Sequence, residues 1–213
     1  PPLVARRTAE VIRAAAAACA RYGPPAGLVL SGAMHSLIAT DADGTCLTNA
    51  WLWSDGRAAD FYRDLRASEE GQEIYRRTGT PIHPMSPLVK LLYLRKRQPG
   101  LFRRARFFLG IKDYVLKELV GEAIGDASLA STTGLLNTRS GAWDEVALRA
   151  AGLTPDRLPR VVPCAAIFRL APGRAARLGL PEGLPLVAGG SDGAMANLGS
   201  GADGPAKLAV PIA

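Results

Sequence analysis

Residues 187–199 read VAGGSDGAMANLG: an apolar strand ends in two glycines and is followed by one acidic side chain and by small residues that can start a helix. Glycines let another molecule approach the backbone closely, so the carboxylate of Asp192 would face open space. An aspartate in this place is suited to catalysis. The plainer alternative is an ordinary strand-to-helix turn in which Asp192 only caps the helix.

A second apolar strand is predicted near the other end of the chain, over residues 27–31. We expect it to be the neighbour of strand 186–189 in one sheet. Because ligand sites in open α/β sheets lie at the carboxyl ends of strands, these two strands would bring His35 and Asp192 to the same cleft.

Helical patterns fill the start and the middle of the chain. The predicted helices cover residues 8–22, 60–66, 71–77, 87–97, 100–106, 112–120 and 144–151, a further short helix opens at 154–156, and a short strand at 36–40 turns at 41–44 into 45–47. Strands near both ends with helices between them predict an α/β fold. The helical middle would be an insertion that covers one side of the sheet.

Composition narrows the classes of partner. The chain has 213 residues, 48% of them hydrophobic, which is enough for one large domain or two small ones with a real core. A net charge of +7 suggests an anionic partner without specifying its kind. Much of the excess lies in residues 95–97 and 103–106, in a pattern typical of the solvated face of a helix pair. The nearby phenylalanines read as core, so nucleic acid is not an expected partner.

The cysteines are Cys19, Cys46 and Cys164, which lie far apart and have no metal-ligand spacing. An odd number of cysteines, without the regular spacing of disulfide pairs, predicts buried thiols in a reducing compartment, which indicates the cytoplasm. No apolar run reaches the length of a membrane span. Neither a metal site nor a membrane partner is therefore expected.

Several segments occur in the order found in the FGGY family of carbohydrate kinases, which the sequence resembles over nearly its whole length. They are 31–36, 53–57, 78–87 with Lys90, 111–114, 128–134, 143–144 and 190–193. Within the family, residues 33–36 and 79–85 are most similar to gluconate kinases, rather than to glycerol or xylulose kinases.

The resemblance implies an actin-like, ribonuclease-H-like α/β domain with a mixed sheet and a helical insertion, which binds a sugar in a cleft that faces an ATP-binding domain. It implies transfer of the γ-phosphoryl group of ATP to D-gluconate, with Mg²⁺, to give 6-phosphogluconate. Asp192 matches the family's catalytic base, which accepts the proton of the attacking hydroxyl. The alternatives are a xylulose or polyol kinase of the same family and a noncatalytic sugar-acid-binding module.

The resemblance also implies a sugar pocket. Met34 and His35 match the family's substrate-contacting pair after the first strand, and Trp53 and Met85 resemble walls of the pocket. An indole and a thioether suit the apolar C–H faces of a polyol, and His35 suits its hydroxyls. Each of these residues could instead belong to the core.

Charged residues near the pocket leave alternatives open. Asp55 and Arg57 either contact the substrate or pair with each other on the surface. Lys90 is either solvated or points inward, where it or Arg57 could offset the gluconate carboxylate. His83 is either a turn residue or a substrate donor.

Two parts of the family pattern lie outside this sequence. The family begins with an aspartate-bearing strand and a glycine-threonine turn that grips the ATP phosphates, and it continues into a second, ATP-binding domain. Pro211 stands where the pattern continues a strand. We therefore expect residues 1–213 to be a partial N-terminal, substrate-side domain that is inactive alone, with ATP and Mg²⁺ held mainly by other parts. The resemblance leaves the oligomeric state open, a homodimer included.

Overall fold

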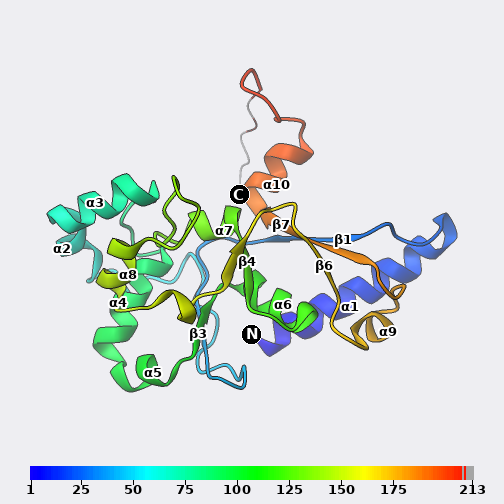
Figure 1. The fold of residues 1–213 in the computed structure, drawn as a ribbon, viewed down its shortest axis with the longest axis horizontal. Helices are drawn as coiled ribbons and strands as arrows, with labels where there is room; N and C mark the ends of the chain where they lie inside the picture. The colour runs from blue at the N-terminus through cyan, green and yellow to red at the C-terminus, as the bar shows by residue number, and fades with distance from the viewer. Residues whose placement is uncertain (208, 210–213) are drawn as a thin grey trace.

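The parallel pairing of β1 (Leu28–Gly32) with β7 (Pro185–Ser191) joins segments from the two ends of the chain in one sheet (Figure 1). β6 (Ile167–Arg169) pairs with β7 in the antiparallel direction, so this sheet is mixed and has the order β1-β7-β6. The computed structural model describes residues 1–207 and 209, so the departure expected at Pro211 lies outside the described residues. The predicted neighbours and the mixed sheet are confirmed.

The other elements surround this sheet or lie beside it. They are the helices α1 (Pro2–Cys19), α2 (Tyr62–Ala67), α3 (Glu69–Thr78), α4 (Pro87–Arg97), α5 (Pro99–Arg104), α6 (Ile111–Val120), α7 (Ala127–Ser131), α8 (Glu145–Ala151), α9 (Arg174–Leu178) and α10 (Asp192–Gly199), the paired strands β2 (Ile38–Thr40) with β3 (Phe107–Leu109) and β4 (Ile124–Asp126) with β5 (Arg160–Val162), and two 3-10 turns, Ala20–Tyr22 and Pro155–Arg157.

A β-bulge interrupts the pairing of β7 with β1. Val29 pairs with Val187 and Ser31 with Gly190, so β7 has one more residue than β1 between these pairs. Gly189 lies in the bulge with a φ of +75°, and a Cβ there would lie 2.0 Å from the carbonyl oxygen of Leu30. The strand can therefore approach its neighbour this closely only because residue 189 has no side chain.

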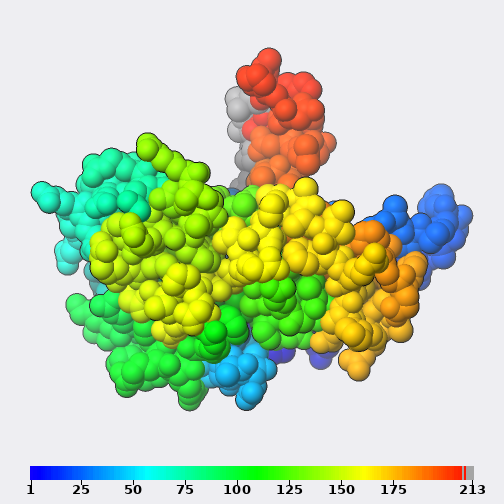
Figure 2. All heavy atoms as spheres, viewed as in Figure 1, coloured from blue at the N-terminus to red at the C-terminus, as the bar shows by residue number. Residues whose placement is uncertain are grey.

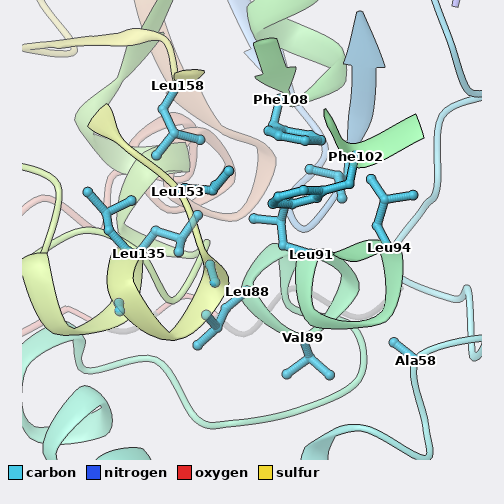
Figure 3. Packing of buried hydrophobic residues seen from close by; sticks show 14 of the residues in the cluster. Ala58, Leu88, Val89, Leu91, Leu94, Phe102, Phe108, Leu135, Leu153 and Leu158 are labelled. Atoms are coloured by element: carbon cyan, nitrogen blue, oxygen red, sulfur yellow. The ribbon is translucent and has the colours of Figure 1, made fainter. Parts of the chain in front are cut away.

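Two large hydrophobic clusters divide the interior, and a small third one lies at β2, β3 and α6. The sheet cluster packs α1, α6 and α9 against β1 and β7, and its buried members include Ile12, Leu116 and Leu186. The helical cluster packs α3, α4, α5 and α8 together around Leu88, Leu91 and other side chains that Figure 3 shows in contact. The expectation that the helical middle covers the sheet is therefore wrong: most of it builds its own core beside the sheet.

Two expectations about the surface had different outcomes. Residues 95–97 at the end of α4 and residues 103–104 of α5 are exposed, as predicted for a solvated helix face, whereas Arg106 is partly buried and pairs with Asp156. The prediction of three buried thiols is wrong, because Cys19 is exposed at the end of α1, and Cys46 and Cys164 are only partly buried. Within the described part of the chain, no helix has both the length and the apolar character needed to cross a membrane.

Candidate active site

The candidate site is formed where β1 and β7 end. β1 leads into residues 33–37, which carry Met34 and His35, and β7 leads through the turn 190–193 into α10. A Cβ on Gly193 would lie 3.6 Å from Cε of Met34, so the methionine lies against this turn. Figure 2 shows α10 and the segment after it, in orange and red, standing out from the body of the molecule.

Asp192 is the first residue of α10 and is exposed, but it does not cap the helix. The cap is Ser191, whose Oγ accepts a hydrogen bond from the backbone N–H of Ala194 at 3.3 Å. One carboxylate oxygen of Asp192 accepts from the backbone N–H of Gly193 at 2.9 Å. The alternative in which Asp192 is only a cap is therefore wrong, and its carboxylate is accessible from solvent.

His35 is held in an unusual backbone conformation. Its φ is 61°, and no other non-glycine residue in the described part of the chain has a positive φ. Its Nδ1 lies 3.0 Å from the carbonyl oxygen of Thr132, which can only accept, so Nδ1 carries the proton. Burial lowers the pKa of His35, while the nearby charge of Asp192 acts in the opposite direction. The neutral ring then presents Nε2 as a hydrogen-bond acceptor.

Lys90 points inward from α4, one of the two alternatives that its sequence position left open. Its fully buried ammonium donates to the carbonyl oxygens of His35 and Leu52, each at 2.6 Å. Burial lowers the pKa of Lys90 to about 8. Two of its three donors are therefore used to tie the loop of His35 to the loop of Trp53, and the bond to His35 restrains the strained residue directly.

Trp53 lies in the next loop with 62% of its surface exposed, so it is not a core residue. In the same loop, Nε of Arg57 donates to Asp55 at 2.8 Å, and the guanidinium lies 4.2 Å from the ring centre of Trp51. The bond from Arg57 lowers the pKa of Asp55. Pairing between Asp55 and Arg57 is thus what the structure contains, and the terminal nitrogens of Arg57 remain available on the surface.

Met85 and His83 lie in the loop between α3 and α4. The backbone N–H of Met85 donates to Nδ1 of His83 at 3.2 Å, and the carbonyl of His83 accepts from Ser86. His83 is therefore a turn residue. Because its Nδ1 accepts, the neutral ring carries its proton on Nε2. Nε2 can therefore also donate a hydrogen bond, as the alternative role of substrate donor requires. Met85 is partly buried.

Asp113, at the start of α6, is a buried carboxyl near the site. Its Oδ2 accepts from the backbone N–H of Gly110 at 2.8 Å, and its Oδ1 has no hydrogen-bond partner among the described residues. It borders a cavity of about 30 Å³ that His35 also lines. Burial raises the pKa of Asp113 to about 6, from 3.8. Ionising this group therefore costs folding free energy.

Replacing Asp113 by asparagine is expected to stabilise the protein at neutral pH. Between pH 4 and 6 the folded state keeps a proton that the unfolded chain has lost, so the free energy of unfolding falls as pH rises through this range. Two pH units correspond to about 3 kcal/mol, of which about 1–2 kcal/mol should be recovered because the amide is itself poorly paired. Urea unfolding at pH 4 and pH 7.5 measures this, and parallel pH dependences of parent and variant would contradict it.

The segments with these residues match known proteins. The profile of the "FGGY family of carbohydrate kinases, N-terminal domain" matches residues 5–199. The chain belongs to this family. It is 41% identical over 189 residues to a gluconokinase of Bacillus licheniformis, covering 88% of this chain and 37% of that protein.

Solved structures of FGGY kinases share the fold. The ligand-bound xylulose kinase from Lactobacillus acidophilus has a TM-score of 0.88 and 30% identity, covering 95% of this chain and 41% of that one. The gluconate kinase from the same organism has a TM-score of 0.81 and 32% identity, covering 84% and 37%. The chain thus spans little more than a third of the length of the curated FGGY relative.

Sequence reasoning missed the residues that hold the site together. Thr132 fixes the ring of His35, and Lys112 and Ser128 hold the turn before Asp192. All three lie within segments that carry the FGGY resemblance. The signal was therefore present in the sequence, but the partners could be assigned only from long-range contacts.

Proposed function

We propose that this chain is the substrate-side domain of an ATP-dependent kinase that phosphorylates D-gluconate to 6-phosphogluconate. The observation that carries the choice of substrate is the 41% identity to a curated gluconokinase, against 33% to a curated xylulose kinase. The carboxylate of Asp192 is exposed and does not cap α10. This supports the choice of reaction, since phosphoryl transfer to an alcohol needs a proton acceptor at the attacking oxygen.

In the proposed reaction, Asp192 accepts the proton of the attacking gluconate hydroxyl. The electron pair of that oxygen forms the new bond to phosphorus as the bond to the leaving ADP breaks. ATP supplies the phosphoryl group as co-substrate. This chain would contribute orientation and a base, because positioning supplies much of the catalysis in phosphoryl transfer.

The substrate contacts follow from the geometry around the loops. Nε2 of neutral His35 would accept a hydrogen bond from a hydroxyl, and Met34, Trp53 and Met85 would lie against C–H faces of the sugar acid. We assign the substrate carboxylate to Arg57. The side chain of Arg57 is 38% exposed, whereas Lys90 is buried and donates to two main-chain carbonyls.

The binding of ATP and Mg²⁺ is assigned to parts of the whole protein outside the candidate site. Among the described residues, no group of three or more His, Cys, Asp or Glu side chains is placed to hold a metal ion, so no step is assigned to Mg²⁺ here. We propose that ATP and Mg²⁺ are held mainly by a phosphate-binding turn and a second domain in the whole protein. A cytoplasmic location and a homodimer stay predictions.

The test compares D-gluconate, D-xylulose and glycerol as substrates of the full-length protein that contains this domain. With ADP release as the readout, we expect kcat/KM for gluconate to exceed that for the others by at least about tenfold, the smallest ratio that differential binding of one group usually produces. A higher value for xylulose or glycerol would favour the alternative within the family. Gluconate binding without ADP release would favour the noncatalytic module.

A further inference from the structure

The turn that carries Asp192 is fixed in part by the pairing of Gly190 and Ser191 with β1 and by the cap that Ser191 provides for α10. Gly189 and Gly190 precede Ser191, and glycine backbones have more freedom than those of other residues. The position of the Asp192 carboxylate therefore also depends on bonds from neighbouring elements. In the described structure, two side chains make such bonds: Lys112 from α6 and Ser128 from α7.

Lys112 holds the main chain two residues before Asp192. Its Nζ donates to the carbonyl oxygen of Gly190 at 3.1 Å and to Oδ2 of Asp126 at 2.8 Å. The side chains of Lys112 and Asp126 are 2% and 0% exposed. A buried ion pair of this kind adds little stability over apolar residues of similar size, because desolvation offsets the attraction. Its effect is to fix a cationic donor at one point.

The path of the lysine stem shows how closely these elements meet. A Cβ on Gly32, the last residue of β1, would lie 2.8 Å from Cβ and 2.9 Å from Cδ of Lys112. The stem therefore passes over the end of β1 to reach β7. The glycine at position 32 leaves the space that this route needs.

Helix α7 and the residue after it hydrogen-bond to both segments of the candidate site, the turn before Asp192 and the loop of His35. Ser128 Oγ accepts from the backbone N–H of Ser191 at 3.1 Å and donates to its Oγ at 2.9 Å. Four residues later, the carbonyl of Thr132 accepts from His35. Asp126 caps this five-residue helix through Leu129, with the oxygen that does not bind Lys112.

We propose that Lys112, neutralised by Asp126, is a positioning residue that holds the carbonyl of Gly190 and thereby orients the carboxylate of Asp192 toward the attacking hydroxyl. This inference rests on the proposed role of Asp192 as the base. Because its side chain is only 2% exposed, Lys112 would not contact the substrate. Its loss should therefore lower kcat rather than weaken the binding of gluconate.

The test replaces both charges in the full-length protein, Lys112→Met with Asp126→Asn, so that no unpaired charge stays buried. Asparagine keeps an acceptor for Leu129, and α7 keeps its cap. The matched control is Arg77→Met with Asp144→Asn. Asp144 is also fully buried, pairs with Arg77 at 2.7 Å and caps α8, but lies in the helical cluster.

We expect the Lys112/Asp126 variant to lose about 10²-fold in kcat, as for a misplacement of about 1 Å, with KM for gluconate changed by less than about threefold. Hydrogen exchange in the peptide 186–195 should become faster. The Arg77/Asp144 variant should lose stability but keep kcat and the exchange rate of that peptide. If the double variant does not fold, Lys112→Arg keeps the ion pair while displacing the donor, and should also lower kcat.

A kcat within about threefold of the parent, or an equal loss in the control, would overturn the proposal. So would unchanged exchange in the peptide 186–195. If the parent protein does not phosphorylate gluconate, the proposed function fails, and the exchange rates still decide whether Lys112 holds the turn.

Discussion

Replacing Asp192 by asparagine is expected to lower kcat for gluconate phosphorylation about 10²–10⁴-fold, the usual contribution of a general base. The measurement uses the full-length protein with saturating gluconate and ATP. Asparagine keeps the shape and the hydrogen-bonding reach of the side chain but cannot take the proton. The affinity for gluconate should change far less, because the amide still contacts the hydroxyl.

His35→Ala provides the contrasting variant. Removing the acceptor Nε2 should raise KM for gluconate by about 3–10-fold, the worth of one net hydrogen bond, with a smaller change in kcat. Opposite patterns for the two variants would separate a base from a binding residue. If Asp192→Asn left kcat within a few-fold of the parent, Asp192 would not be the base.

The second large effect is expected for Gly189→Ala, which should lower the free energy of unfolding by about 3–5 kcal/mol. The new Cβ would lie 2.0 Å from the carbonyl oxygen of Leu30, which is main chain and cannot move without disturbing β1. The φ of +75° adds the strain of a left-handed conformation. Thermal and urea unfolding measure the loss.

Gly179→Ala is the matched control for this prediction. Gly179 has a φ of +66°, and nothing lies within 4 Å of a Cβ built there. This variant carries the left-handed strain alone and should cost only about 1–2 kcal/mol. Equal losses for the two variants would mean that the close approach to Leu30 contributes nothing.

Two of the three strands in the sheet, β1 and β7, were predictable because each is a continuous apolar run that ends in glycine or small polar residues. Strands 27–31 and 186–189 were predicted to be neighbours in one sheet, and the structure shows that they pair in the parallel direction. Four strands of three residues each, β3, β4, β5 and β6, were not predicted. A strand of that length has too few residues to show a period of two, and its pairing comes from tertiary packing.

The residues of the candidate site could be predicted from the sequence, but the hydrogen bonds that position them could not. Asp192 and His35 could be placed at one end of the sheet from their positions after strands. The sequence interpretation considered Asp192 as the cap of α10, but the cap is Ser191, because a helix start cannot be located to one residue from sequence. The inward direction of Lys90 depends on carbonyls 55 and 38 residues away in the chain, which no local pattern encodes.

The sheet cluster and the helical cluster are separate groups of buried side chains, so we expect the two parts of the chain to open separately. Lys90 lies on α4, which contributes Leu88, Val89 and Leu91 to the helical cluster, whereas the loop that it holds at His35 extends from β1 of the sheet cluster. Local opening of either part would release this connection while the other part stays folded. On heating, gluconate binding should therefore be lost at a lower temperature than the bulk of the secondary structure.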